Sequence, residues 1–297
     1  MELVTQCPVC QSDAITPFLE CKDHFLSGET FSIVECGNCS FRFTNPRPEA
    51  DQLGRYYQSP EYISHSNSRK GFFNRIYQAV RKYTLWQKYR LISDASSGKK
   101  ILDIGCASGE FLRYMQMKGW ETAGIEPDRA TREKAVQQYK LKIFDETELS
   151  IFPEAHFDVI TLWHVLEHVS DLNARMQQLS RLLKASGTLI IAVPNAESLD
   201  AISYGPFWAG YDVPRHLYHF TADTMKRLLD RYAFQLVRIR PMKFDAFYVS
   251  LLSEKYKQGK LRWIPGFWQG LRSNVKASGN GNYSSLIFIS RKAPAGF

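Results

Sequence analysis

The chain has 297 residues, of which 44% are hydrophobic and 13% aromatic, and its formal net charge at pH 7 is +8. This length and composition exclude a disordered chain and favour one large folded domain with a smaller addition. The sequence opens without a charged and then apolar leader and holds no apolar run of about 18 residues, so we expect no membrane span, no secretion and a cytoplasmic location.

The positive charge is concentrated toward the end of the chain. The net charge is +2 for residues 1–99, −4 for residues 100–230 and +10 for residues 231–297. Basic residues in the last segment alternate with aromatic ones such as Trp263 and Trp268, a composition typical of contact with nucleic acid, a phospholipid surface or a nucleotide-linked substrate. A solvated basic face is the plainer alternative and stays open.

Five of the six cysteines fall within residues 1–45. Four of them form two C-x-x-C pairs about 25 residues apart, a spacing that matches a tetrahedral four-thiolate zinc site. Disulfides are the competing interpretation, but a reducing compartment disfavours them. We therefore predict a zinc-ribbon module over residues 1–45, with short strands near Phe31–Val34 and Phe41–Phe43 and a structural zinc held by Cys7, Cys10, Cys36 and Cys39. Cys21 lies outside both pairs and is expected to be a free thiol.

A helical segment is expected to connect this module to the next domain. Asn45–Pro48 predicts a rigid extended exit, and residues 50–57 predict a short helix. Residues 69–93 carry apolar side chains at intervals of three to five, which predicts an amphipathic helix with a basic polar face. We assign residues 46–98 to a helical lid and linker.

The stretch from Lys100 to Met117 predicts a strand, a glycine-containing turn and a helix. Ile101, Leu102 and Ile104 form a buried strand, and Gly105 and Gly109 punctuate the turn before the helical pattern begins. Glycines at such a turn let a ligand approach the main chain, where the first helical amides can donate to it.

From Lys100 the chain alternates regularly between strand and helix patterns. The predicted strands are 100–104, 121–125, 141–144, 157–163, 188–193, 235–240 and 284–290, and the predicted helices are 109–118, 128–139, 171–184 and 221–232. This pattern predicts an α/β fold: a doubly wound, seven-stranded, Rossmann-like sheet with a reversed last strand, in addition to the zinc ribbon. The domain would cover residues 99–297 with an insertion at about 245–282.

Two motifs of this domain resemble class I S-adenosylmethionine-dependent methyltransferases. The motifs are Asp103-Ile-Gly-Cys-Ala-Ser-Gly109 and Gly124-Ile-Glu-Pro-Asp128. The resemblance implies that Gly105, Cys106 and Gly109 line the methionine end of the cofactor, that Asp103 orients this loop, and that Glu126 binds both ribose hydroxyls. S-adenosylmethionine is therefore the expected cofactor, with S-adenosylhomocysteine as its product.

The resemblance extends to the start of the chain. A cysteine-rich module that leads through Pro-Arg-Pro into such a domain is similar to a group of bacterial methyltransferases, several of which act on sugars in nucleotide-linked or polysaccharide pathways. It implies that aromatic and histidine side chains of the linker close over cofactor or substrate, or else pack a helical lid: Tyr56, Tyr57, Tyr62 and His65. The resemblance also places Asp145 and Glu146, after the third strand, near the adenine amino group.

The segment Trp163-His-Val-Leu-Glu-His-Val169 follows the fourth strand of the domain. One helical turn there would bring His164, Glu167 and His168 onto a single face. The run resembles that of ubiquinone-pathway O-methyltransferases, in which an acid–acid–His set is linked to a divalent metal. Because His164 replaces the first acid, we expect these residues to act in general-base catalysis rather than in metal binding, with His164 also near the cofactor. A purely structural role for His168 stays open.

A long loop rich in aromatic residues follows the fifth strand. Its segment from Gly205 to Phe220 contains Asp212, Arg215 and His216, which could bind or deprotonate a hydroxylated substrate, and Trp208 and Tyr211, which could stack on a ring. His219 is expected to be structural.

We therefore expect methyl transfer to a small hydroxylated acceptor such as a sugar or nucleotide sugar, with His168 or His216 as base. An RNA methyltransferase that uses the zinc ribbon and basic tail is one alternative, and a cofactor-binding scaffold without turnover is another. A small-molecule acceptor is the favoured partner and nucleic acid the less favoured one. The sequence leaves the oligomeric state open.

Overall fold

The computed structural model of the chain describes residues 1–57 and 72–293. Of the predicted linker side chains, Tyr62 and His65 lie outside the described residues, as does the start of the predicted basic helix. Within the described residues, no helix combines the length and apolar character needed to cross a membrane. The chain divides into two compact units. The first comprises residues 1–59, 164–175 and 191–289, and the second residues 60–163, 176–190 and 290–297.

A seven-stranded sheet has the strand order β10-β11-β8-β7-β4-β5-β6. Its strands are β4 (Lys100–Ile104), β5 (Glu121–Ile125), β6 (Ile143–Phe144), β7 (Phe157–Trp163), β8 (Leu183–Pro194), β10 (Phe234–Pro241) and β11 (Ser285–Lys292). The pairs β4–β5, β4–β7 and β5–β6 are parallel. The last strand of the chain enters the sheet between β8 and β10, and the predicted fold class is confirmed.

The strands of the second unit form because their side chains are almost continuously apolar. In β4 and β5 every residue after the first is buried, as expected for parallel strands that are covered on both faces. The helices are α2 (Phe72–Ala95), α3 (Glu110–Met117), α4 (Arg129–Tyr139) and α5 (Leu172–Leu182), and η2 (Glu146–Ile151) is a short 3-10 helix. Helix α3 buries Phe111, Leu112 and Met115, and Asp128 caps α4 by accepting from the Thr131 amide.

One predicted boundary in the second unit is wrong. The helix expected to run to residue 184 ends at Leu182, and β8 begins at Leu183, five residues earlier than predicted. Ser186 and Gly187, which fall between the predicted helix and the predicted strand, lie inside the strand. Leu183 is completely buried, so tertiary packing outweighs the local breaker signal at this point.

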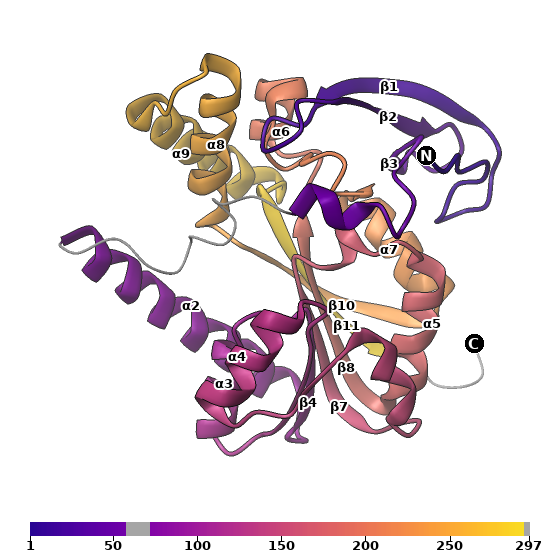
Figure 1. Cartoon of the computed structure of the whole chain (residues 1–297), viewed down its shortest axis with the longest axis vertical. Helices are drawn as coiled ribbons and strands as arrows, with labels where there is room; N and C mark the ends of the chain where they lie inside the picture. The colour runs from indigo at the N-terminus through magenta and orange to yellow at the C-terminus, as the bar shows by residue number, and fades with distance from the viewer. Residues whose placement is uncertain (58–71, 294–297) are drawn as a thin grey trace. The chain divides into compact units, whose positions relative to one another are not determined.

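A four-stranded sheet in the first unit has the order β1-β2-β3-β9. Its strands are β1 (Ile15–Lys22), β2 (Thr30–Cys36), β3 (Arg42–Thr44) and β9 (Tyr218–His219), and β1 and β2 form a long antiparallel pair (Figure 1). The strands expected near Phe31 and Phe41 correspond to β2 and β3, whereas β1 was not predicted. Phe43 lies opposite Tyr218, so residues more than 170 positions apart complete the sheet.

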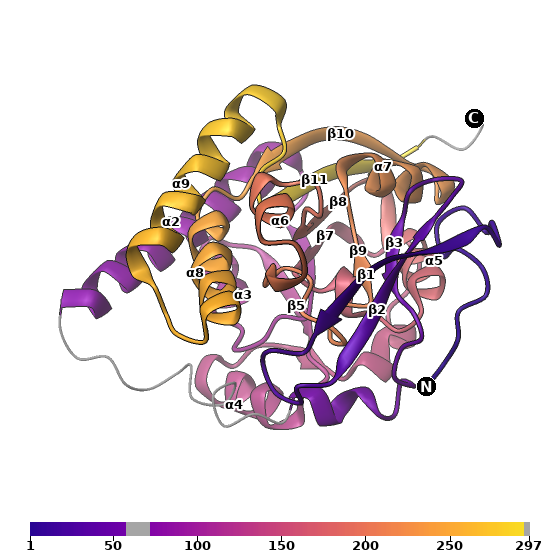
Figure 2. The ribbon, with the colours of Figure 1, turned by 90° about the horizontal axis from the view of Figure 1, so that it is seen from above.

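The core of the first unit combines residues from the start of the chain with the loop after β8. Its buried members are Cys21, Phe31, Ile33, Tyr56, Ala196, Ala201, Tyr204, Trp208, Tyr211 and Val213. The surrounding elements are η1 (Leu53–Tyr57), η3 (Leu166–His168), α6 (Leu199–Tyr204), η4 (Gly205–Phe207) and α7 (Ala222–Arg231). The predicted insertion is occupied by α8 (Asp245–Gln258) and α9 (Trp263–Asn280), which pack side by side (Figure 2).

Candidate functional site

The loop between β4 and α3 turns through three residues with positive φ. Gly105 and Gly109 have φ of 70° and 72°, and Ala107 between them has φ of 46°. A Cβ added at Gly109 would lie 2.7 Å from Leu141 Cδ1, so conformation and space both require glycine there. The backbone of Ala107 and Ser108 is consequently held at the exposed tip of the loop, ahead of the α3 N-terminus.

Glu126, directly after β5, ties this loop to the neighbouring strand. One carboxylate oxygen accepts the Ala107 amide at 2.8 Å and the other accepts the Asp128 amide at 3.0 Å. Burial raises the pKa of Glu126, although these two hydrogen bonds oppose the shift. A carboxylate has about four acceptor sites, so both oxygens can still accept hydroxyl groups.

Asp103 is buried within β4, where Thr161 Oγ1 of β7 donates to it at 2.5 Å. Burial raises the pKa of Asp103 to about 7, against the effects of the Thr161 hydrogen bond and the Lys88 charge. The Cys106 thiol is also buried, and its Sγ would lie 2.6 Å from a Cβ added at Gly124. The buried side chains of Asp103 and Cys106 therefore support the loop between β4 and α3 from the protein interior.

The two acids after β6, Asp145 and Glu146, have different surroundings. Asp145 caps η2 by accepting from the Thr147 amide at 3.1 Å, and its second oxygen lies 3.0 Å from Arg132. These contacts lower the pKa of the Asp145 carboxyl, chiefly through Thr147. Glu146 is exposed. The prediction that both acids lie near adenine remains open, with Asp145 already committed to a structural cap.

The loop between β4 and α3 is thus held in a fixed conformation that can accommodate S-adenosylmethionine. The carboxyl ends of β4, β5 and β7 lie at one edge because these strands are parallel, and ligands of such sheets bind at that edge. At the end of β7, Trp163 is contacted edge-on by Phe111 at 6.0 Å and by Lys88 Nζ at 4.0 Å from its ring centre. Its buried Nε1 has no hydrogen-bond partner among the described residues.

The sequence predicted that His164, Glu167 and His168 lie on one helical turn. This prediction is wrong for His164. His164 has φ of 56° and precedes the 3-10 helix η3. Its Nδ1 still lies 3.3 Å from Glu167 Oε1, and its Nε2 lies 3.0 Å from Asp245 Oδ2 at the start of α8. Burial opposes a charge on His164, but the hydrogen bonds to Asp245 and Glu167 outweigh it and raise its pKa to about 10.

Three of the predicted catalytic residues converge in the first unit. Glu167, His168 and His216 each offer a ligand atom within 4.8 Å of the others. His168 Nδ1 lies 3.0 Å from the Arg215 carbonyl oxygen, and His216 Nδ1 lies 2.8 Å from the Gly210 carbonyl oxygen. A carbonyl oxygen only accepts, so each Nδ1 carries a proton, and in a neutral ring Nε2 then keeps the lone pair.

The charge on this cluster follows from its burial. Burial, and after it the nearby His216, lowers the pKa of His168 to about 4. Burial would raise the pKa of Glu167, but His164 reverses the direction and keeps the carboxyl ionised. Glu167 Oε1 faces His164 Nδ1 at 3.3 Å, and the buried Oε2 has no hydrogen-bond partner within the described part of the chain. The cluster is therefore rich in acceptors and can take up a proton or a cation.

Two residues of this site were missed or given little weight in the sequence. The Tyr57 hydroxyl lies 3.0 Å from His168 Nδ1, whereas Tyr57 was predicted to close over cofactor or substrate or to pack a helical lid, without a histidine partner. Asp245 gave no signal because it stands 81 positions after His164 and opens the helical insertion. Contacts between residues so far apart in the sequence depend on the tertiary fold, so local sequence patterns cannot predict them.

The predicted substrate loop is largely occupied by internal contacts. Arg215 pairs with Asp212 at 2.6 Å and with Asp23 at 3.0 Å, and its own side chain is 3% exposed. Trp208 and Tyr211 are buried in the core of the first unit and border a small pocket with His24 and Tyr256. His219 is buried beside Thr44 Oγ1 at 3.2 Å, in agreement with the structural role expected for it.

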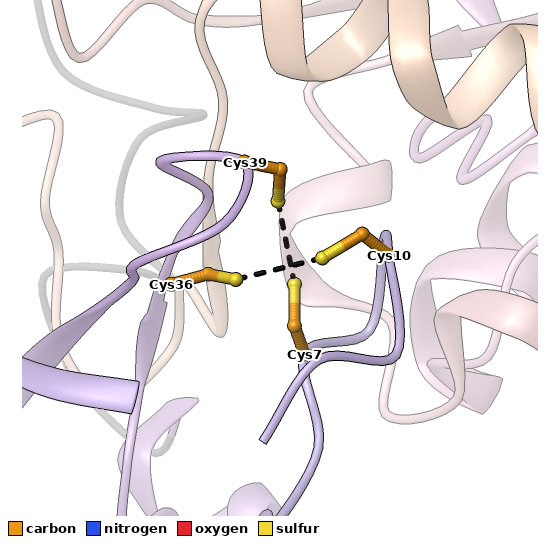
Figure 3. A group of neighbouring side chains, drawn as sticks. All are labelled: Cys7, Cys10, Cys36 and Cys39. Atoms are coloured by element: carbon orange, nitrogen blue, oxygen red, sulfur yellow. Dashed lines mark hydrogen bonds between the residues drawn. The ribbon is translucent and has the colours of Figure 1, made fainter. Parts of the chain in front are cut away.

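The four cysteines of the two C-x-x-C pairs also converge within the first unit. Figure 3 shows Cys7 and Cys10 on one loop facing Cys36 and Cys39 on another, with the sulfurs directed toward one centre. The Sγ–Sγ distances are 3.6 Å for Cys7–Cys39 and 3.5 Å for Cys10–Cys36. Metal–sulfur bonds of about 2.3 Å give tetrahedral edges of about 3.8 Å, whereas a disulfide is about 2.05 Å. The donor set therefore fits a tetrahedral zinc ion.

A family model described as a methyltransferase domain matches residues 77–239, just over half of the chain. The chain belongs to this methyltransferase family. Its fold and its relatives agree in making it an S-adenosylmethionine-dependent methyltransferase. The model does not extend to the cysteine-rich module, so the family match carries no information about zinc.

The curated relatives cover a limited part of this methyltransferase. The ubiquinone biosynthesis O-methyltransferase of Pasteurella multocida is 30% identical over 115 residues, which span 33% of this chain and 48% of that protein. The protein of the same name from Alkalilimnicola ehrlichii is 31% identical over 106 residues, with shares of 33% and 42%. The chain thus spans less than half the length of these two relatives.

A solved structure shares the fold over a larger part of the chain. It is the geranyl diphosphate C-methyltransferase of Streptomyces coelicolor A3(2), in complex with Mg²⁺, geranyl diphosphate and S-adenosyl-L-homocysteine. The TM-score is 0.54, the sequence identity is 10%, and the likeness covers 82% of this chain and 97% of that one. At this identity the likeness concerns the fold alone.

Proposed function

We propose that this methyltransferase transfers the methyl group to a hydroxyl of a small, sugar-like acceptor and that the Glu167–His168–His216 cluster takes up the acceptor proton. The observation that carries the proposal is the hydrogen bond from His168 Nδ1 to the Arg215 carbonyl, which leaves Nε2 as a proton acceptor. The ordered loop that supplies this carbonyl also supplies His216.

A histidine with a pKa of about 4 is adequate for this task. The methyl group that S-adenosylmethionine supplies is displaced in line by the acceptor oxygen. As the new carbon–oxygen bond forms, the hydroxyl proton becomes strongly acidic, so a weak base suffices to remove it. The low pKa keeps His168 unprotonated at neutral pH, and the ionised Glu167 stabilises the proton once it has moved.

For the cofactor, we propose that Glu126 accepts the ribose hydroxyls while the loop from Gly105 to Gly109 holds the methionine end. The support is the positive φ of both glycines and the two-oxygen arrangement of Glu126. His164, Asp145 and Glu146 are further candidates. Sugar-like acceptors are favoured by the resemblance of the cysteine-rich start.

A divalent cation at the cluster is the second candidate, favoured by the buried Glu167 Oε2, which has no hydrogen-bond donor among the described residues. Imidazole nitrogens and a carboxylate oxygen are suitable ligands for several divalent metals. In that case the cation would lower the pKa of the acceptor hydroxyl, and a free histidine base would not be needed.

The test is a screen for acceptor-dependent release of S-adenosylhomocysteine with sugars, nucleotide sugars, phenols and RNA. For the accepted class, His168→Ala and His216→Ala should reduce turnover at least tenfold while S-adenosylhomocysteine affinity stays unchanged. Unchanged turnover in both variants would refute the base assignment. Metal analysis of the same proteins separates the two candidates, because a cation at the cluster requires a bound metal equivalent that His216→Ala removes and Cys36→Ser does not.

A further inference from the structure

Helix α9 packs against α8 through a face of very small residues. Gly266, Gly270, Ser273 and Ala277 are its buried members, spaced so that they lie on one line along the helix. A Cβ added at Gly270 would lie 2.8 Å from the Ala246 carbonyl oxygen, so the two helix backbones approach closely. This line of small residues fixes which face of α9 points away from α8.

The opposite face of α9 is apolar and exposed. Ile264, Trp268 and Val275 are 72%, 62% and 65% exposed, respectively. At 100° per residue they lie about 180° from the small-residue line. Phe267 on the flank is also exposed, and its ring stacks on Phe247 of α8 at 5.2 Å. A helix in water normally places polar side chains on this face, so the stripe indicates an interaction surface.

From Lys255 to the end of α9 the charged side chains have a single sign. This stretch contains no acid and six basic residues, Lys255, Lys257, Lys260, Arg262, Arg272 and Lys276, all of which are exposed. The two acids of the hairpin, Asp245 and Glu254, lie earlier, in α8. The surface of α9 and of the segment before it therefore combines protruding apolar side chains with positive charge.

We propose that the exposed face of the α8–α9 hairpin docks this methyltransferase onto an anionic phospholipid surface. Ile264, Trp268 and Val275 would enter the boundary between headgroups and acyl chains, and the surrounding lysines and arginines would lie near lipid phosphates. The inference goes beyond the proposed methyl transfer and does not depend on which acceptor is used.

The charge distribution favours lipid over a second copy of the chain. Two copies meeting through this face would bring two basic segments together without an acid in either to compensate them. RNA would satisfy the charge, but bases stack on aromatic rings, and two of the three most exposed positions are the aliphatic Ile264 and Val275. Aliphatic and indole side chains beside basic ones are the combination that an anionic membrane interface accepts.

The proposal is tested by flotation of the full-length protein with vesicles of phosphatidylcholine alone or mixed equally with phosphatidylglycerol. We expect binding to the anionic vesicles only, weakened at least tenfold by Ile264→Ser with Trp268→Ser. Arg272→Gln with Lys276→Gln should weaken binding and reduce its salt dependence. Ile202→Ser, at a residue of α6 that is 71% exposed, is the matched control and should bind as the unaltered protein does.

Circular dichroism and S-adenosylhomocysteine affinity should be the same in all variants, because every altered side chain is exposed. Absence of binding to anionic vesicles, or equal binding by the Ile264/Trp268 variant, would overturn the proposal. A concentration-dependent dimer that the same variant abolishes, or RNA binding without vesicle binding, would assign the surface to another partner and likewise overturn it.

Discussion

Arg215 and Asp23 form a buried ion pair, with 3.0 Å between Nη2 and Oδ1 and side-chain exposures of 3% and 0%. Asp23 follows β1, whereas Arg215 lies in the loop that leads to β9. Asp23 also accepts the amides of Phe25, Leu26 and Ser27, so its carboxylate organises the turn after β1. The pair thus fixes the position of the loop that carries His216.

Replacing Arg215 with Ala should destabilise the protein by about 3–5 kcal/mol, because Asp23 would stay buried without its counter-charge. The exposed pair Arg129–Glu133 supplies the control, since Glu133→Gln should leave the free energy of unfolding almost unchanged. Urea unfolding of both variants measures the difference. A loss for Arg215→Ala as small as that for Glu133→Gln would show that the buried pair has no structural role.

The His164–Asp245 contact should make stability depend on alkaline pH. The pKa of His164 is about 10 in the folded protein and about 6.5 when unfolded. Its contribution is complete below about pH 6.5 and is lost as the pH rises toward 10, because the unfolded chain releases the proton first.

Asp245→Asn should therefore lower stability at pH 7 and flatten the decline between pH 7 and 9.5. We expect a cost of about 1–2 kcal/mol at pH 7, reduced by solvent screening because His164 is about one third exposed. Denaturant unfolding at a series of pH values measures it, with Asp223→Asn in α7 as control. Parallel pH profiles for Asp245→Asn and the unaltered protein would contradict the assignment.

Local sequence was sufficient for the parts of the fold whose signals are local. The strand, turn and helix from Lys100 to Met117 were predicted within a residue because buried apolar runs and positive-φ glycines are properties of neighbouring residues. The cysteine pairs were likewise found from spacing alone. β9 is only two residues long and forms because Tyr218 pairs with Phe43, so no local sequence pattern could predict it.

The candidate site likewise contains residues that local sequence could predict and residues that it could not. Glu167, His168 and His216 were selected from their chemistry and their place after strands, and the fold brings them within 4.8 Å. The helical geometry expected for His164 failed because its left-handed backbone ends the strand before η3 begins. Asp245 could not be found, since only the packing of α8 brings it to His164.

Glu126→Gln should weaken S-adenosylhomocysteine binding at least tenfold. The side chain keeps its shape, but the amide group replaces one carboxylate oxygen with a donor, which faces a backbone amide and can no longer accept a hydroxyl. Glu121→Gln, on an exposed side chain of β5, is the matched control and should bind normally. Calorimetric titration measures both affinities. Normal affinity in Glu126→Gln would exclude this carboxylate as a ribose ligand.

The cysteine cluster should hold one zinc per chain, and loss of one thiolate should release it. Three thiolates leave an incomplete tetrahedral site, so Cys36→Ser should reduce the bound zinc to well below one equivalent and lower the melting temperature. Arg231 of α7 donates to the carbonyls of Pro8 and Val9 in the first cysteine turn, so loosening that turn should also expose the end of α7 to proteolysis. Cys21→Ala is the control: this thiol is buried but lies outside the cluster, so the variant should lose stability and keep its zinc. Equal zinc content in Cys36→Ser and Cys21→Ala would place the metal elsewhere.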